Sequence, residues 1–206
     1  MSGVPLAPGL VYHPDYLDRA GQGLLLDAVR TVTRAAPLFT PTMPRTGKPF
    51  SVRMTNCGPL GWVSDRSGYR YQALHPETGA PWPAIPPAAL QAWAELSGFG
   101  HPPEACLVNF YQGSARMGLH QDRDEAALAA PVVSLSLGDT ALFRYRGLAR
   151  TDPTRSLRLR SGDALVFGGP ARLMFHGVDR LEPGTSDLLP QGGRLNLTLR
   201  RVTQPA

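Results

Sequence analysis

Cysteine is scarce in this sequence. Cys57 and Cys106 are the only two among 206 residues, and they do not form a CxxC pair. This usage excludes a disulfide framework and a cysteine-based zinc site. The sequence also lacks the basic run and long apolar core of a secretory signal peptide, and no stretch approaches the roughly 18 apolar residues of a membrane span. We therefore expect a soluble protein of the reducing cytoplasm with no membrane partner.

Charge is sparse as well. Only 18% of the residues are charged, and the formal net charge of +5 permits a polyanionic partner without demonstrating one. The sequence shows no internal repeat and no low-complexity tail. Proline and glycine are abundant, with 21 and 22 residues, and this favours many short elements joined by turns over a bundle of long helices.

Two segments in the first half have the pattern of helices. Residues 16–36 place apolar side chains at helical spacing, and residues 87–97 open with proline and end before Gly98. Residues 37–87 are rich in proline and are expected to form loops with short strands. The first half is therefore predicted to be an α/β region.

From residue 104 onwards the pattern becomes that of strands. Short alternating or apolar segments are separated by Gly, Pro and Asp at about ten-residue intervals, which is typical of an all-β sandwich or barrel. The sequence thus predicts an α+β protein, mainly β, in a single domain over 1–206. Residues 1–103 would form an N-terminal extension and residues 104–206 a β-core.

The segment GLHQDRDE, residues 118–125, contains the first candidate for a functional site. In an extended strand His120, Asp122 and Asp124 would share one face. One histidine and one carboxylate are two of the three ligands in the site that binds non-haem Fe(II) and leaves coordination positions open. The alternative is that these are ordinary polar residues on an exposed strand, because an HxD pair alone has low specificity.

A metal site would need a third ligand from elsewhere in the chain. Three of the five histidines, His13, His75 and His101, stand directly before proline in loop-like segments. His176 instead ends an apolar segment 54 positions after Asp122. It is either a structural residue at the end of a strand or the missing ligand, carried by a strand that returns beside the first.

The segment GRLNLTLRR near the C-terminus separates polar and apolar residues between two faces. Arg194, Asn196, Thr198 and Arg200 fall on one face of a strand and three leucines on the other. The arginines would lie in water if the strand is half exposed. If the polar face points into a barrel, their planar guanidinium groups would suit a dicarboxylate. Together with HxD and His176, this second arrangement suggests an iron oxygenase that uses 2-oxoglutarate.

Several sequence segments, taken in their order along the chain, resemble those of the bacterial AlkB alkylation-repair dioxygenases, which depend on Fe(II) and 2-oxoglutarate. The resemblance runs from about residue 50 to 200 and rests on long, specific segments. These are MTNCGPLGW (54–62), GYRY (68–71), PWPAIP (81–86), ACLVNFY (105–111), LHQDRDE (119–125), APVVSLSLG (130–138), RTDP (150–153), FGGPARLMFHG (167–177) and RLNLTLR (194–200).

The resemblance implies a double-stranded β-helix (jelly-roll) core whose N-terminal α/β extension forms a nucleotide-recognition lid. It implies one Fe(II) per chain, with 2-oxoglutarate and O2 as co-substrates. The implied reaction is oxidative demethylation of bases such as 1-methyladenine and 3-methylcytosine, releasing succinate, CO2 and formaldehyde. The implied partner is alkylated nucleic acid, single-stranded DNA first and RNA as an alternative, and the protein is expected to be a monomer.

The resemblance also implies roles for individual residues. The iron ligands would be His120, Asp122 and His176. The residues that hold 2-oxoglutarate would be Asn109, Tyr111, Arg194, Asn196 and Arg200, with Arg194 on the distal carboxylate and Arg200 near the iron-proximal one. The substrate-contacting residues would be Trp62, Tyr69, Tyr71, Asp124 and Arg150.

The composition of the expected lid agrees with a nucleic-acid substrate. Between residues 51 and 72, three aromatic residues alternate with arginines, a mixture suited to stacking on bases and contacting phosphates. The alternative is a partly buried aromatic cluster with surface arginines. The negative charge of Asp124 would favour a cationic alkylated base over a normal one.

Three other functions remain open at this stage. The chain could be a 2-oxoglutarate dioxygenase acting on a protein or small molecule, a non-catalytic binder of damaged nucleic acid, or a metal-binding β-barrel with other chemistry. The aromatic and basic lid argues against the first. The combination of HxD, His176 and two arginines argues against the second, because recognition alone needs neither a metal site nor a co-substrate site.

Overall fold

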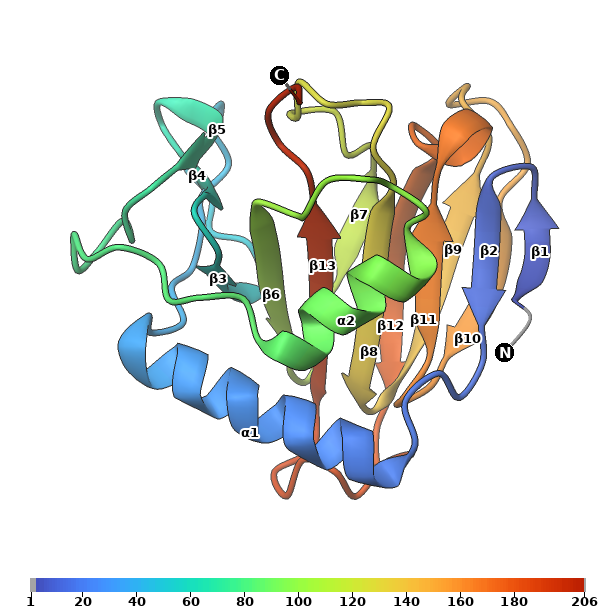
Figure 1. Ribbon diagram of the computed structural model, residues 1–206, viewed down its shortest axis with the longest axis horizontal. Helices are drawn as coiled ribbons and strands as arrows, with labels where there is room; N and C mark the ends of the chain where they lie inside the picture. Colours follow the sequence, from blue (N-terminus) through green and yellow to red (C-terminus); the bar gives the residue numbers. More distant parts are fainter. Residues whose placement is uncertain (1–2, 206) are drawn as a thin grey trace.

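Two facing β-sheets form the centre of the molecule, and two helices cover the outer face of the larger one (Figure 1). The computed structural model describes residues 3–205. In this part of the chain the large sheet has seven strands, in the order β1 (Val4–Ala7), β2 (Leu10–His13), β11 (Ala164–Phe167), β8 (Val132–Gly138), β13 (Arg194–Arg200), β6 (Ala105–Tyr111) and β3 (Arg53–Cys57). The small sheet has the order β10 (Arg155–Leu159), β9 (Thr140–Arg146), β12 (Phe175–Glu182) and β7 (Met117–His120). The predicted α+β, mainly β jelly-roll fold is confirmed.

The two predicted helices are present and pack on the large sheet. Helix α1 (Arg19–Ala35) begins after Asp18, whose side chain accepts a hydrogen bond from the backbone N–H of Gly21 at 2.7 Å, and this satisfies one of the free donors of the first turn. Helix α2 (Pro87–Leu96) begins with Pro87, which needs no N–H partner there. Helix α1 begins three residues later and ends one residue earlier than the predicted range 16–36. Helix α2 begins at the predicted residue and ends one residue earlier than the predicted range 87–97.

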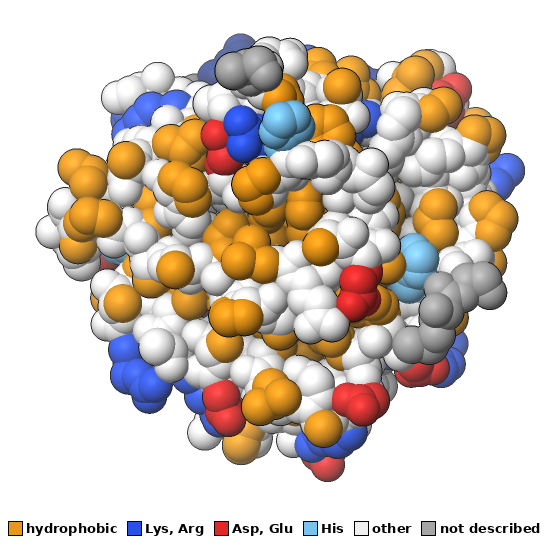
Figure 2. All heavy atoms as spheres, viewed as in Figure 1, with side chains coloured by type: hydrophobic (Ala, Val, Ile, Leu, Met, Phe, Trp, Pro, Cys, Tyr) orange, Lys and Arg blue, Asp and Glu red, His pale blue; other side chains and the backbone are white. Residues whose placement is uncertain are grey.

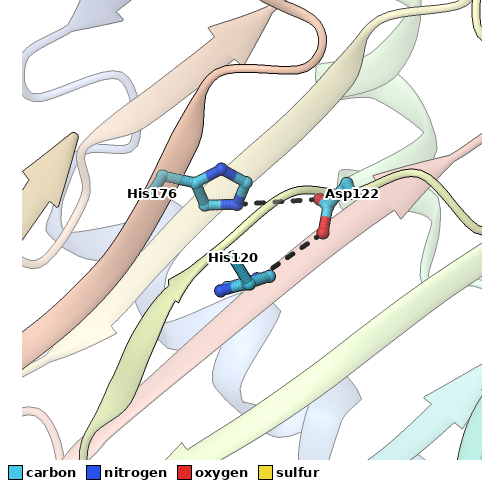
Figure 3. A group of neighbouring side chains, drawn as sticks. All are labelled: His120, Asp122 and His176. Atoms are coloured by element: carbon cyan, nitrogen blue, oxygen red, sulfur yellow. Dashed lines mark ion pairs between the residues drawn. The ribbon is translucent and has the colours of Figure 1, made fainter. Parts of the chain in front are cut away.

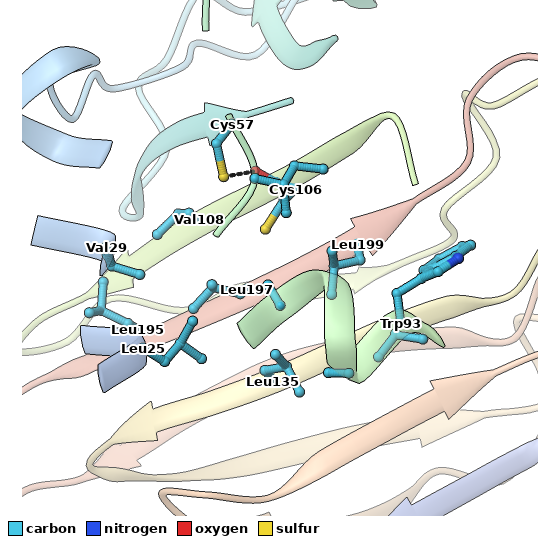
Figure 4. Close-up of a cluster of buried hydrophobic side chains, with 14 of the residues drawn as sticks. Leu25, Val29, Cys57, Trp93, Cys106, Val108, Leu135, Leu195, Leu197 and Leu199 are labelled. Carbon is cyan, nitrogen blue, oxygen red and sulfur yellow. Dashed lines mark hydrogen bonds between the residues drawn. The ribbon is translucent and has the colours of Figure 1, made fainter. Parts of the chain in front are cut away.

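Apolar side chains from the helices meet the leucines of β13 to form one half of the core (Figure 4). Leu25 and Val29 of α1 and Trp93 of α2 are buried in this cluster. They contact a sheet face that includes Leu135, Leu195, Leu197 and Leu199. Burying a side chain of this size stabilises the fold by roughly 1.5–3 kcal/mol, so this cluster anchors the helical layer.

Strand β13 lies in the middle of the large sheet, between β8 and β6. Its leucines face the helices, while Arg194, Thr198 and Arg200 are buried on the opposite face, towards the small sheet. The interpretation of this segment as a half-exposed strand with arginines in water is therefore wrong. Both faces are buried, and the polar face lines the space between the sheets.

Strands β1 and β2 were not expected from the sequence. They are four residues each, and β2 pairs with β11 at the edge of the large sheet. Strand β3 pairs with β6 at the other edge. The segment 1–103 therefore adds strands to the core sheet, and the separate element is the hairpin of β4 (Gly61–Asp65) and β5 (Gly68–Gln72).

Among residues 3–205 no helix reaches the length and hydrophobicity needed to cross a bilayer.

Candidate active site

Strand pairing places two histidines directly opposite each other. His120 is the last residue of β7, and His176 is the second residue of β12; the two pair in register although 56 positions separate them in the sequence. Their ring centroids are 4.6 Å apart. A Cβ at Gly177 would lie 2.5 Å from the carbonyl oxygen of Met117, so glycine is required for β7 and β12 to approach this closely.

Asp122 completes the cluster (Figure 3). One of its carboxylate oxygens lies 3.6 Å from Nε2 of His120 and the other 3.8 Å from Nε2 of His176. The three ligand atoms lie within 4.8 Å of one another. Strand β7 ends at His120, so the expectation that His120, Asp122 and Asp124 share one face of an extended strand is wrong; the two aspartates lie in the loop that follows.

Hydrogen bonds fix both imidazole rings with Nε2 towards the cluster. Nδ1 of His120 lies 2.9 Å from the carbonyl oxygen of Gly118, and Nδ1 of His176 lies 3.1 Å from that of Met174. A carbonyl can only accept, so Nδ1 carries the proton and Nε2 keeps its lone pair in the neutral ring. Burial and the neighbouring His120 lower the pKa of His176 to about 4, and His176 is therefore neutral near pH 7.

Asp122 is ionised in spite of being buried. Burial works to raise its pKa, but the attraction of Arg200, and after it of His176 and His120, outweighs burial and holds the pKa of Asp122 well below its usual range. Two imidazoles with Nε2 turned towards the cluster and one carboxylate on one side are the donor set that suits Fe(II) with open coordination positions. The residues present therefore fit an iron ion.

A cavity of about 350 Å³ lies between the two sheets and contains this cluster on its wall. The polar face of β13 supplies Arg194, Asn196, Thr198 and Arg200, and β6 supplies Asn109 and Tyr111. All five residues proposed from the resemblance to hold 2-oxoglutarate thus line the same cavity as the metal cluster.

Arg194 is a buried cation in this cavity. It is 1% exposed, and burial lowers its pKa only to about 10, so it stays protonated. Its guanidinium donates to the carbonyl oxygens of Asp139 and Leu159, each at 3.1 Å, and to the hydroxyl of Ser136 at 2.6 Å. None of these partners is charged. Leaving a buried charge uncompensated is costly, and an anionic group of a ligand would remove that cost.

Three buried polar atoms of the cavity have no hydrogen-bond partner among residues 3–205. They are Oδ1 of Asn109, Nε of Arg194 and Nη1 of Arg200. Native proteins satisfy nearly all such atoms, so their convergence in one cavity indicates a polar ligand with several acceptors and at least one donor or bound water. A dicarboxylate such as 2-oxoglutarate offers these acceptors.

Arg200 differs from Arg194 because it already has acidic partners. It donates to Oδ2 of Asp122 at 2.8 Å and approaches Glu125 at 3.3 Å. Asn196 is held by Ser134, which accepts from its amide at 2.8 Å. Arg200 therefore lies beside the metal cluster, and Arg194 lies at a separate position on the same strand.

The hairpin β4–β5 extends the cavity with aromatic side chains. The indole of Trp62 stacks on the ring of Tyr69 with centroids 5.6 Å apart, and its N–H donates to Asp124 at 2.9 Å. Tyr69 is 52% exposed. Trp62, Tyr69, Asp124 and Arg150 all line the cavity. Tyr71 does not line it, and its hydroxyl instead donates to Glu125.

A buried ionic network that the sequence did not reveal supports this wall. Arg172 donates to Glu125 at 3.0 Å, to the carbonyl oxygen of Asp122 at 2.5 Å and to that of Ala130 at 2.9 Å. Glu125 also accepts a hydrogen bond from the hydroxyl of Tyr71 and forms an ion pair with Arg200. The network thus connects the hairpin with the metal cluster. The only signal in the sequence was an arginine within the apolar segment around residues 164–178.

A jelly roll with two histidines and one carboxylate beside a buried arginine defines the class of 2-oxoglutarate-dependent iron oxygenases, and a family model described as 2OG-Fe(II) oxygenase superfamily matches residues 9–200. The chain is 57% identical over 197 residues to the "Alpha-ketoglutarate-dependent dioxygenase AlkB homolog" of Caulobacter vibrioides, covering 96% of this chain and 89% of that protein. It is 41% identical over 202 residues to the "Alpha-ketoglutarate-dependent dioxygenase AlkB" of Escherichia coli, covering 96% and 92%. The chain belongs to the AlkB family of this superfamily.

The solved structures agree with this assignment. The structure of OsALKBH1 matches with a TM-score of 0.78 and 35% identity, covering 97% of this chain and 100% of that one. As a member of the family, the protein uses Fe(II) with 2-oxoglutarate and O2.

The position of Arg194 leads to a first prediction. Arg194→Met is expected to raise the KM for 2-oxoglutarate about 100-fold, because removing one partner of a buried charge pair costs about 2–5 kcal/mol. Arg194→Lys keeps a charge but not the planar fork, and is expected to recover part of the loss. The measurement is the KM from succinate release, together with the rise in Tm that 2-oxoglutarate causes in the presence of Mn²⁺.

The control is Arg34→Met on the exposed surface of α1, which should leave both quantities unchanged. A KM within about threefold of the wild-type value in Arg194→Met would contradict the assignment of Arg194 to the co-substrate.

Proposed function

We propose that this protein repairs nucleic acid by oxidative demethylation of N-alkylated bases, such as 1-methyladenine and 3-methylcytosine. One observation carries the proposal: a single cavity brings together the His120, Asp122 and His176 cluster, the buried cation of Arg194 and the stacked aromatic rings of the hairpin. The relatives named above are described as dioxygenases of the AlkB type, and an Arabidopsis thaliana relative, 33% identical over 229 residues, as a "DNA N(6)-methyladenine demethylase".

The residues have distinct roles in this proposal. His120, Asp122 and His176 hold Fe(II), which together with 2-oxoglutarate and O2 supplies the oxidation that releases the alkyl carbon as formaldehyde, with succinate and CO2. Arg194 binds the distal carboxylate of 2-oxoglutarate. Arg200 lies against Asp122, near the iron-proximal end of the co-substrate. It keeps the carboxylate of Asp122 ionised and oriented.

Asn109, Tyr111 and Asn196 complete the co-substrate site in this proposal. Asn109 presents an unpartnered buried amide oxygen to the cavity, and Tyr111 is 3% exposed beside it on β6. Burial raises the pKa of Tyr111 far above neutrality, so its hydroxyl is a hydrogen-bond donor and never an anion at physiological pH. It therefore favours an anionic ligand.

The wall near the hairpin is proposed to receive the base. Trp62 and Tyr69 present aromatic faces on which a flipped base can stack, as single-stranded nucleic acids stack on protein side chains. Asp124 is held by the indole N–H of Trp62, which leaves its second oxygen for an exocyclic amine. Its charge favours a cationic alkylated base. Arg150 lies at the rim with its guanidinium over the ring of Phe175 and is proposed to contact a phosphate.

We propose a positioning role for Tyr71 in place of a contact with the substrate. It was expected to contact the substrate, and its hydroxyl is bound to Glu125 behind the wall. We propose that it positions the hairpin over the metal cluster, so that its effect on the base is exerted through Trp62, its cross-strand partner.

The finer features of the proposal are single-stranded DNA as the main substrate, RNA as a second one, and action as a monomer in the cytoplasm. The half-buried ring of Trp62 and the exposed ring of Tyr69 favour an unpaired strand. Cys57 and Cys106 are both free thiols, which agrees with a reducing compartment. The chain is proposed to work as one domain, with the hairpin β4–β5 as its nucleotide-recognition lid.

The deciding experiment measures formaldehyde and succinate from protein loaded with Fe(II) without oxygen and then given O2 and 2-oxoglutarate. A single-stranded oligonucleotide with one 1-methyladenine is compared with its unmethylated counterpart. Formaldehyde is expected only from the methylated strand, in equal amount to succinate above the background. Succinate without matching formaldehyde would point to a protein or small-molecule substrate, and no succinate under any condition would leave a binding protein or other metal chemistry.

A further inference from the structure

The outer face of the small sheet carries a group of arginines that the reaction does not use. Along β9, Ala141, Phe143 and Tyr145 are buried between the sheets. Successive side chains of a strand point to opposite faces, so Arg144 and Arg146 point outwards.

The neighbouring strands add two more arginines to the same face. Leu142 of β9 is paired with Arg158 of β10 on one side and with Arg180 of β12 on the other. Side chains that are directly opposite in a sheet lie on the same face. We call the group formed by Arg144, Arg146, Arg158 and Arg180 the arginine face.

Acidic groups neutralise the arginine face only in part. Arg144 and Arg180 share one carboxylate, that of Asp179, at 3.3 and 3.0 Å, and Arg158 pairs with Glu182 at 2.9 Å. The three arginine side chains are still 43%, 63% and 69% exposed. Exposed ion pairs of this kind contribute little stability, so a polyanion can displace the carboxylates at small cost.

Arg146 connects this face with the rim of the cavity. It has no carboxylate partner among residues 3–205; Nη1 donates to the carbonyl oxygen of Arg150, and Nε has no partner there. Arg150, whose guanidinium lies over the ring of Phe175, lines the cavity. The arginine face therefore begins next to the cavity rim, where Arg146 contacts Arg150.

The opposite side of the molecule has a different character. The face that bears α1 and α2 shows basic and acidic side chains scattered among hydrophobic ones (Figure 2). On the arginine face, positions 142 to 146 of β9 span about 13 Å, which corresponds to about four stacked nucleotides.

We propose that the arginine face binds the phosphate backbone of the nucleic-acid strand that flanks the damaged base. The inference rests on the proposed nucleic-acid substrate. Phosphates passing Arg150 at the rim would continue onto Arg146 and Arg144 and then reach Arg158 or Arg180. Because these residues contact neither the base nor the metal cluster, they add affinity for longer strands and leave the chemical step unchanged.

The test compares two triple variants that each lose three positive charges. In the first, R144Q/R158Q/R180Q, the arginine face is neutralised. In the control, R19Q/R30Q/R34Q, three exposed arginines of α1 are lost, two of which also pair with carboxylates. Binding is measured by anisotropy of a labelled methylated single strand of about 25 nucleotides between 50 and 300 mM salt. Turnover is measured on this strand and on one of about five nucleotides.

The first variant is expected to bind the long strand about 10-fold more weakly at low salt. Its plot of log affinity against log salt should be less steep by about two, because each lost single-strand phosphate contact reduces the slope by about 0.7. Its kcat on both strands and its KM on the short strand should equal those of the control variant. The proposal would be overturned if the first variant kept the wild-type affinity and salt dependence. It would also be overturned if the control variant lost as much affinity as the first variant, or if the KM of the first variant rose as much on the short strand as on the long one. If wild-type protein binds the strand but releases no formaldehyde, the proposed function fails while the binding comparison still decides this inference.

Discussion

Asp122→Ala is expected to abolish turnover, with succinate release reduced at least about 1,000-fold, while binding of a methylated oligonucleotide changes less than about threefold. Asp122 is the only carboxylate in the metal cluster, and each of its oxygens faces one imidazole. Without it, the two histidines remain beside the cation of Arg200 with no negative charge in the cluster, an environment that repels a divalent metal ion. The measurements are succinate release, Mn²⁺ affinity by calorimetry and oligonucleotide binding.

Asp124→Ala provides the matched control, because it removes a carboxylate two residues further along the same loop. It should keep metal affinity and the background release of succinate, and lose preference for the methylated base. Turnover above about one percent of wild type in Asp122→Ala would show that the metal site lies elsewhere, since a lost metal ligand costs more than the 10–100-fold typical of its supporting residues.

Arg172→Met is expected to lower the free energy of unfolding by about 3–5 kcal/mol, the loss typical of removing one partner from a buried ion pair. Arg172 and Glu125 have side chains only 4% and 2% exposed and lie 3.0 Å apart. The change also leaves the carbonyl oxygens of Asp122 and Ala130 without this donor. Urea unfolding of the metal-free protein measures the effect.

Arg30→Met is the control for this prediction, because Arg30 forms an ion pair with Asp27 at 2.8 Å on the exposed surface of α1. Exposed pairs contribute about 0–1 kcal/mol, so little change is expected. The double variant R172M/E125Q should recover little of the loss, because in Arg172→Met the carboxylate of Glu125 still has Arg200 at 3.3 Å and the hydroxyl of Tyr71 as partners. Equal, small losses in Arg172→Met and Arg30→Met would refute a structural role for the network.

The sequence alone predicted the elements of the core because their patterns are local. Both helices and the strands after residue 104 lie close to where periodicity and turn residues place them. The faces of β13 were not predictable in this way. Alternation separates Arg194 from Leu195, but only the position of the strand between β8 and β6, with a layer on each side, decides that both are buried.

The residues that the structure brings together in the cavity could be named from the sequence, but their geometry could not. His120 and His176 could be named, yet their opposition depends on pairing between β7 and β12, which no local signal specifies. Asp122 is buried, with 8% of its surface exposed, whereas Asp124 is exposed. This difference arises because strand β7 ends at His120 and both aspartates lie in the loop that follows. Glu125 and Arg172 were missed because a buried ion pair joins segments 47 positions apart, and each charge alone looks like a surface residue.

The central place of β13 also bears on how the protein is made. A ribosome delivers β6 and β8 long before residues 194–200, and until then the two strands that flank β13 have no neighbour on their inner edges. The pairings of β13 with β6 and with β8, and with them the closure of the large sheet around the cavity, wait until residues 194–200 have been made. Open edges of this kind invite pairing with other chains. Nascent copies of this enzyme therefore depend on rapid insertion of β13, or on chaperones, to avoid aggregation before the active site exists.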